Sequence, residues 1–232
     1  MKKVHSVLFA AAAMLLFSPD AHAGDISGKI SFKGRAPEIP QIKMNADKQC
    51  LAMHPKPVNS EDVVINSNGT LKNVFIYIKS GLNKKYDVPT TPVVLAQQGC
   101  QYRPHVFGIQ AGQPLEIVND DPLLHNIHAL PKNSPQFNNA QPIKGMKMTK
   151  KFDKPEVMVK FKCEVHNWMN CYAGVVDNPF YAVSDDKGDF TIKGIPNGTY
   201  TIEVWHEKYG TQDMTVTVGD KGAKADFTYV GK

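Results

Sequence analysis

The 232-residue sequence has few of the features that mark membrane or nucleic-acid-binding proteins. Its single long apolar stretch lies at the extreme N-terminus and is too short to span a bilayer as an ordinary helix. The net charge of +5 comes from basic residues spread along the chain, whereas nucleic-acid binding concentrates them on one stripe. We therefore expect no transmembrane segment in the mature chain and no nucleic-acid partner.

Motifs of the common hydrolases are also missing. The sequence has no Gly-x-Ser-x-Gly elbow and no His-Glu-x-x-His zinc motif. Acidic pairs such as Asp120 with Asp121 are typical of turns, and adjacency in sequence does not make an acid–base pair. The sequence therefore predicts a protein that is not an enzyme.

The N-terminus has the three parts of a secretory signal. Two lysines follow the initiator Met, residues 7–17 are apolar, and residues 21–23 form a small-residue cleavage site. We expect residues 1–23 to be a signal peptide that is cleaved after Ala23, which predicts a bacterial periplasmic protein. That compartment is oxidising and favours disulfides.

The rest of the sequence predicts strands and turns. Short segments rich in β-branched and aromatic residues alternate with Gly, Pro and Asn, and no window keeps a 3.6-residue period over three turns. Asn68-Gly69, between two apolar segments, is a hairpin signal. Residues 131–151 have little periodicity, which predicts a long loop. We expect an all-β fold built from sandwiches.

The C-terminal part and two upstream segments resemble the carboxypeptidase regulatory-like family. The matching segments are residues 184–190, 194–202, 209–210, 26–30 and 73–78. The resemblance implies a small prealbumin-like β-sandwich. Because its strands are far apart in the sequence, we expect a split domain, residues 24–88 plus 178–232, with residues 89–177 inserted.

Residues 163–169 contain several metal donors. Cys163, His166 and Met169 are spaced as Cys-x2-His-x2-Met, and His125 offers a second imidazole at the start of a predicted strand. One thiolate, two imidazoles and a weak thioether form the donor set of a copper site, whereas zinc prefers four firm ligands. Each residue alone is more often structural, since buried Cys and Met commonly belong to a core. Their combination predicts one copper ion per chain.

Residues 91–177 resemble the cupredoxins, amicyanin and plastocyanin most closely. The order of the segments 101–106, 111–119 and 125–128 carries the likeness, together with the short Cys-x2-His-x2-Met loop. The resemblance implies a Greek-key β-sandwich with a type 1 copper site. His125, Cys163 and His166 would be the equatorial ligands and Met169 the axial ligand.

The same resemblance implies roles for neighbouring residues. Asn126 would join the two ligand-bearing loops, and electrons would pass through an exposed edge of the His166 ring. Because Trp168 lies between two of the predicted ligands in the sequence, we also expect it to form a hydrophobic lid over the copper. The sequence departs from its relatives at Leu124 and Asn167, where those proteins have Pro. The reduction potential is therefore left open.

The resemblance implies a periplasmic blue copper protein that carries single electrons between redox partners. A c-type cytochrome or a periplasmic oxidoreductase is the natural partner. The alternative is a copper-binding or copper-delivery module, or a structural interaction module, without an electron-transfer role. The prealbumin-like part favours this alternative because such sandwiches are commonly interaction units.

Four cysteines allow three pairings. With Cys163 assigned to copper, we predict a disulfide between Cys50 and Cys100 and a free buried thiol at Cys171. Cys50 also belongs to a weaker candidate for a second, Cu(I) site, which includes Met53 and His54.

Overall fold

The computed structural model describes residues 23–231. The expected signal peptide, residues 1–23, lies outside these residues except for Ala23. The described chain forms seventeen strands and one short helix, which confirms the all-β prediction. In this part of the chain, no helix is both long and apolar enough to cross a membrane.

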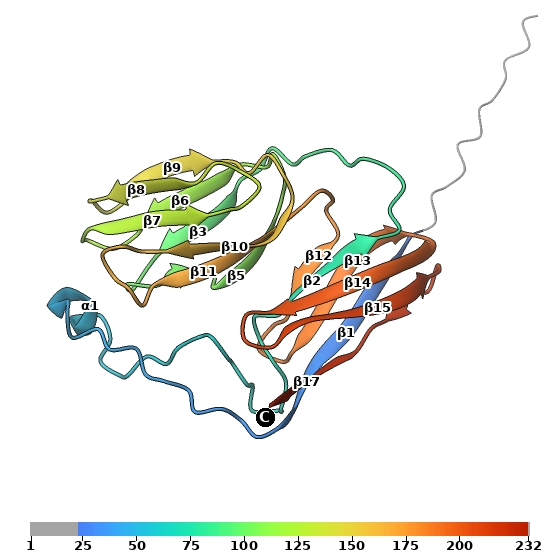
Figure 1. The fold of residues 1–232 in the computed structure, drawn as a ribbon, viewed down its shortest axis with the longest axis horizontal. Helices are drawn as coiled ribbons and strands as arrows, with labels where there is room; N and C mark the ends of the chain where they lie inside the picture. Colours follow the sequence, from blue (N-terminus) through green and yellow to red (C-terminus); the bar gives the residue numbers. More distant parts are fainter. Residues whose placement is uncertain (1–22, 232) are drawn as a thin grey trace, which may run out of the picture.

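The first and last parts of the described chain form one β-sandwich, which we call the terminal sandwich (Figure 1). In one sheet β1 lies between β13 and β16 and also pairs with β17, and the other sheet has the order β12-β2-β14-β15. Apolar residues that alternate along these strands fill the space between the sheets. Its strands are β1 (Ala23–Gly34), β2 (Phe75–Ser80), β12 (Tyr181–Val183), β13 (Asp189–Pro196), β14 (Gly198–His206), β15 (Gly210–Val218), β16 (Ala223–Lys224) and β17 (Phe227–Gly231).

The strands between β2 and β12 form a second sandwich, the central sandwich. Its sheets have the orders β5-β11-β10-β7-β8 and β4-β3-β6-β9, and a separate apolar core lies between them. Its strands are β3 (Val93–Gln97), β4 (Tyr102–Arg103), β5 (Val106–Gln110), β6 (Leu115–Asn119), β7 (His125–Leu130), β8 (Phe137–Gln141), β9 (Lys147–Lys150), β10 (Glu156–Lys162) and β11 (Asn170–Val176).

The prediction of a long loop over residues 131–151 was wrong, because β8 and β9 lie within it. β8 pairs with β7, and β9 pairs with β6. Most side chains of these two strands are exposed or half-buried. Strands that bury few side chains show little apolar alternation in the sequence, and this explains the error.

Glycines allow the two sandwiches to pack closely. A Cβ atom built on Gly174 of β11 would lie 2.2 Å from the ring of Phe75 in β2, and one on Gly108 of β5 would lie 2.2 Å from the ring of Tyr181 in β12. Phe75 is fully buried at this contact. A larger residue at either glycine would have to displace an aromatic ring.

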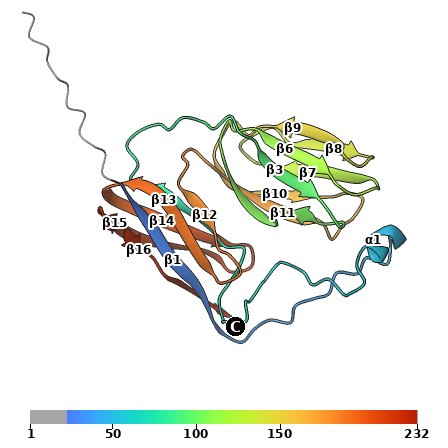
Figure 2. The same cartoon turned by 180° about the vertical axis from the view of Figure 1, so that it is seen from behind.

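The segment between β1 and β2 leaves the terminal sandwich and reaches the end of the central one (Figures 1 and 2). We call residues 39–60 the strap. Its two legs pair at Gln41 and Asn59, and its tip carries α1 (Lys48–Ala52). Cys50 of α1 is fully buried in the core of the central sandwich. The strap therefore packs on the central sandwich, although it lies in the range expected for the terminal one.

Candidate metal centre

Three of the predicted ligands converge at one end of the central sandwich. His125 begins β7, whereas Cys163 and His166 lie in the turn between β10 and β11. The Nδ1 atoms of the two imidazoles are 3.1 Å apart, and Sγ of Cys163 is 4.0 Å from Nδ1 of His166. One donor atom from each residue lies within 4.8 Å of the other two, and all three residues are buried.

Backbone hydrogen bonds shape the turn that carries Cys163 and His166. The N–H of Cys163 donates to the carbonyl of Met169 at 3.1 Å, and the N–H of Met169 donates to the carbonyl of His166 at 2.9 Å. The N–H of His166 donates to Sγ of Cys163 at 3.3 Å. The Cys-x2-His-x2-Met spacing therefore fits one closed turn, and Met169 is buried at its end.

Asn126 links the two segments that supply ligands. Its Oδ1 accepts a hydrogen bond from the N–H of Glu164 at 2.9 Å, and its Nδ2 donates to Oδ1 of Asn138 in β8. This contact holds the start of β7 beside the Cys163 turn, so it fixes the separation of His125 from the other donors.

The outward-facing nitrogens of both imidazoles contact carboxylates. Nε2 of His125 is 2.8 Å from Oδ2 of Asp121, and Nε2 of His166 is 3.2 Å from Oδ2 of Asp47 in the strap. A carboxylate on the distal nitrogen fixes the tautomer that leaves Nδ1 free to bind a metal. Both rings are thus oriented with Nδ1 toward Cys163.

The electrostatics of the site suit a cation. Burial opposes ionisation of the Cys163 thiol, but hydrogen bonds from His125 and His166 outweigh it and lower the pKa to about 6. Burial likewise disfavours the charged imidazoles, yet Cys163 and the carboxylates of Asp121 and Asp47 raise the pKa values of both histidines. The site therefore contains a thiolate and has a carboxylate behind each imidazole, and this negative charge favours a bound cation.

The donors present fit a copper ion. A trigonal site with bonds of roughly 2.0 Å to nitrogen and 2.3 Å to sulfur has nitrogen–nitrogen and nitrogen–sulfur edges of about 3.5 and 3.7 Å. The observed separations of 3.1 and 4.0 Å lie close to these values. Two imidazoles and one thiolate, with a buried Met in the same turn, match copper better than zinc.

The predicted disulfide between Cys50 and Cys100 is present. It removes Cys50 as a thiolate ligand, and Nε2 of His54 is instead 2.7 Å from the carbonyl of Gly99. The weaker candidate for a second Cu(I) site is therefore not assembled. Cys171 is a free, fully buried thiol, as predicted, and burial raises its pKa.

The expectation of an exposed His166 ring edge was wrong. His166 is only 2% exposed, because Asp47 and the Cys50 sulfur, 3.5 Å from Nε2, cover the ring. Sequence reasoning also missed both carboxylates. The Asp-x3-His spacing of Asp121 and His125 offered a local signal, but Asp47 is 119 residues from His166 and offered none.

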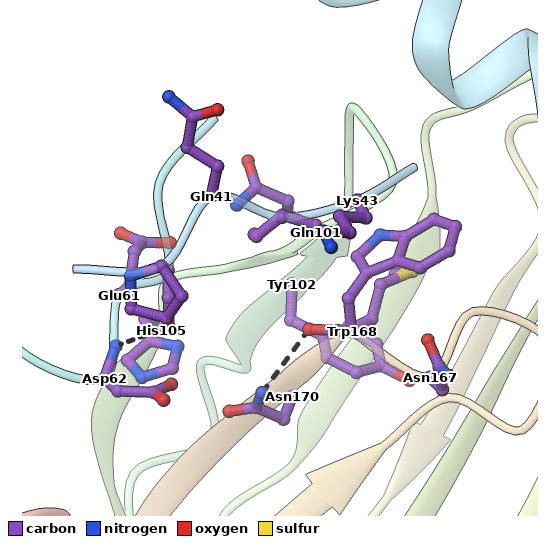
Figure 3. A pocket seen from close by; sticks show the side chains of 14 residues that line it. Gln41, Lys43, Glu61, Asp62, Gln101, Tyr102, His105, Asn167, Trp168 and Asn170 are labelled. Atoms are coloured by element: carbon purple, nitrogen blue, oxygen red, sulfur yellow. Dashed lines mark hydrogen bonds between the residues drawn. The ribbon is translucent and has the colours of Figure 1, made fainter. Parts of the chain in front are cut away.

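A polar cavity of about 390 Å³ lies beside the ligand turn (Figure 3). Trp168 forms part of its wall, and the indole lies next to His166 with ring centroids 5.0 Å apart. The indole Nε1 donates to the carbonyl of Cys100 at 3.0 Å. Lys43 and Asp62 line other parts of the cavity. The Trp168 indole thus lies between the solvent in the cavity and the His166 ring.

Comparisons with known proteins give partial structural likenesses only. No protein-family model matches the chain, and no curated protein matches its sequence. Similar solved structures include a copper-containing nitrite reductase from Thermus scotoductus SA-01, which is 22% identical and has a TM-score of 0.35. That match covers 43% of this chain and only 25% of the reductase chain.

Two smaller proteins are also similar. A purple cupredoxin from Nitrosopumilus maritimus is 22% identical over 35% of this chain and 97% of its own, with a TM-score of 0.31. An oxidised amicyanin variant is 16% identical over 43% of this chain and 97% of its own, with a TM-score of 0.34. These neighbours are cupredoxins of low identity and partial coverage, so the chemistry of the site rests on its own geometry.

Proposed function

We propose that this protein is a type 1 copper protein of the cupredoxin kind that carries single electrons in the bacterial periplasm. One observation carries the proposal: Nδ1 of His125, Nδ1 of His166 and Sγ of Cys163 converge in a buried site. Copper held there would supply a one-electron couple. Met169, buried at the end of the same turn, would offer its thioether as a fourth donor.

The protein's own residues prepare this site for copper. With a pKa of about 6, the thiol of Cys163 is a thiolate at neutral pH, which is the form that binds metals. Asn126, Asp121 and Asp47 hold the ligand-bearing segments and rings in place. Because protein donors fill the proposed coordination positions, no position is left for a substrate, and we propose that the protein is not an enzyme.

Trp168 is the proposed route for electrons. The His166 ring is closed to solvent, but Trp168 lies against that ring and borders the cavity. Electron transfer requires a short separation between the redox centres. A partner, such as a c-type cytochrome or a periplasmic oxidoreductase, would therefore approach the cavity rather than the edge of His166.

The test is the visible absorption and EPR spectrum of the mature protein with one equivalent of Cu(II). We expect an intense blue thiolate-to-copper band and narrow copper hyperfine splitting, and Cys163→Ser should abolish both. Cys171→Ser is the matched control, since this second free, buried thiol is not part of the donor group and the band should remain.

A colourless protein with ordinary tetragonal copper signals would contradict the proposal, because Cys163 would then not bind Cu(II). The copper-delivery or structural alternative would lead in that case. Rapid, reversible oxidation and reduction supports the electron carrier, whereas copper release to an acceptor with slow electron exchange supports delivery.

A further inference from the structure

The strap supplies a group to the metal centre from outside the central sandwich. Asp47 stands directly before α1 and caps it: Oδ1 accepts hydrogen bonds from the N–H groups of Gln49 at 2.8 Å and Cys50 at 3.1 Å. The other oxygen, Oδ2, lies 3.2 Å from Nε2 of His166. The helix cap thus holds the carboxylate in one orientation, with its free oxygen toward the imidazole.

The disulfide fixes the strap at this position. Cys50 of α1 is bonded to Cys100, which lies in the turn after β3, and the Cys50 sulfur contacts Nε2 of His166 at 3.5 Å. Asp121, the carboxylate on the other imidazole, accepts hydrogen bonds from the N–H groups of Gly99 and Cys100, each at 2.8 Å. One disulfide therefore connects the segments that hold both carboxylates.

We propose that Asp47 is a positioning residue of the metal centre, held on His166 by the Cys50–Cys100 disulfide. This inference rests on the proposed function. A carboxylate that accepts the distal N–H of a ligating imidazole fixes the ring and makes the imidazole a stronger donor. Asp47 does this for His166 as Asp121 does for His125, although Asp47 belongs to a segment outside the central sandwich.

The charge of Asp47 sets the sign of its effect. Cu(II) with one thiolate leaves a net charge of +1, and Cu(I) with one thiolate leaves none. A nearby carboxylate attracts the first more than the second, and because the Asp47 side chain is 30% exposed, water screens this attraction only in part. Asp47 therefore stabilises Cu(II) relative to Cu(I) and lowers the reduction potential.

The test is Asp47→Asn, which removes the charge but keeps a good helix cap, since Asn and Asp cap equally well. We expect the blue band to remain, the Cu(II) affinity to fall about 10- to 100-fold, and the reduction potential to rise. Competition with a copper chelator gives the affinity, and spectroelectrochemical titration gives the potential. Asp47→Ser also keeps a helix cap, but its side chain is too short to reach His166. It should likewise lower the Cu(II) affinity and raise the reduction potential.

Asp120→Asn is the matched control. Asp120 precedes Asp121 in the sequence and is half-buried, and its backbone N–H donates to the carbonyl of Gln97, so the substitution removes only its side-chain charge. It should leave affinity and potential near those of the unmodified protein. In a Cys50→Ser/Cys100→Ser background the strap loses its covalent link to the central sandwich, so Asp47→Asn should have a smaller effect there.

Three outcomes separate the hypotheses. Unchanged affinity and potential in Asp47→Asn, with the blue band intact, would overturn the role of Asp47 and leave it as a helix cap. An effect of the same size without the disulfide would overturn the role of Cys50–Cys100. Lack of a blue band in the unmodified protein would instead refute the proposed function itself.

Discussion

The two sandwiches bury histidines in opposite ways. In the terminal sandwich, His206 is 2% exposed and lies beside the rings of Tyr209 and Tyr229, with centroids 4.9 and 5.8 Å away. Its Nδ1 accepts a hydrogen bond from the N–H of Lys208 at 3.0 Å. Burial lowers the pKa of His206 to about 4, so the imidazole is neutral and serves as part of the core.

In the central sandwich, His125 and His166 are equally buried, but each contacts a carboxylate and both lie near a thiolate. Their pKa values are raised despite burial. The difference shows that burial alone does not distinguish the proposed ligand histidines from a core histidine. The distinguishing sign is a carboxylate on one ring nitrogen and a second donor residue facing the other.

Removal of the disulfide should produce the largest difference in stability between the two sandwiches. Cys50 and Cys100 are separated by 50 residues, and a loop of this length corresponds to a loss of about 4 kcal/mol in the free energy of unfolding. We expect Cys50→Ala/Cys100→Ala to lower the stability of the central sandwich by about this amount. The chain has two tryptophans, Trp168 in the central sandwich and Trp205 in the terminal one.

Urea unfolding of the metal-free protein, followed in single-tryptophan variants, places one probe in each sandwich, and the Trp205 ring also contacts Tyr172 of the central sandwich with centroids 5.0 Å apart. The transition reported by Trp168 should shift to lower urea, and that of Trp205 should shift less. Equal shifts at both probes would show that the sandwiches unfold as one cooperative unit.

Acid should destabilise the terminal sandwich through His206. Its pKa is about 4 when folded, against 6.5 for an ordinary histidine, so the unfolded chain binds the proton more tightly between these values. The contribution of neutral His206 to the free energy of unfolding is fully present above pH 6.5. It is lost as the pH falls toward 4, and the total loss is about 3 kcal/mol. Burial is the main cause; nearby His105 acts in the same direction and Asp62 against it.

His206→Gln is the variant that isolates this effect, since its side chain does not titrate. The stability difference between the two proteins, from urea unfolding at several pH values, should narrow as the pH falls from 7 to 4. A constant difference over that range would show that His206 is not held neutral in the folded protein.

A methyl group at the contact between the sandwiches should have a smaller effect. Gly174→Ala would place its Cβ 2.2 Å from the Phe75 ring. Such overpacking typically lowers the free energy of unfolding by about 1–3 kcal/mol. Gly219→Ala is the control, because its Cβ would meet no atom within 4 Å. Thermal unfolding should show a lower melting temperature for the first variant, and equal values would contradict the close contact.

The smallest effect is expected at an exposed ion pair. Lys29 Nζ contacts Asp189 at 2.5 Å, but the two side chains are 43% and 50% exposed. Water and salt screen such pairs, so Lys29→Gln should change the stability by less than about 1 kcal/mol. A larger loss in urea unfolding would indicate that the β1–β13 contact depends on this charge.

Local patterns in the sequence predicted much of the fold and the donors. Alternating apolar residues predicted the all-β architecture. The expected oxidising compartment, with Cys163 assigned to copper and Cys171 expected to be a free buried thiol, left Cys50 and Cys100 as the predicted disulfide. The spacing of Cys163 and His166 fits one turn, since residues three apart in a closed turn face the same point. The strand pattern and the turn spacing depend on neighbouring residues, whereas the disulfide joins cysteines 50 residues apart and followed from the assignment of the other two cysteines.

Tertiary structure alone decided how the centre is enclosed. Asp47 reaches His166 across 119 residues because the strap leaves one sandwich and docks on the other, and no pattern near either residue encodes that contact. The same docking closed the ring edge that the resemblance implied was open. Contacts between distant segments depend on how whole surfaces pack, whereas spacing within one turn is set by the geometry of the backbone.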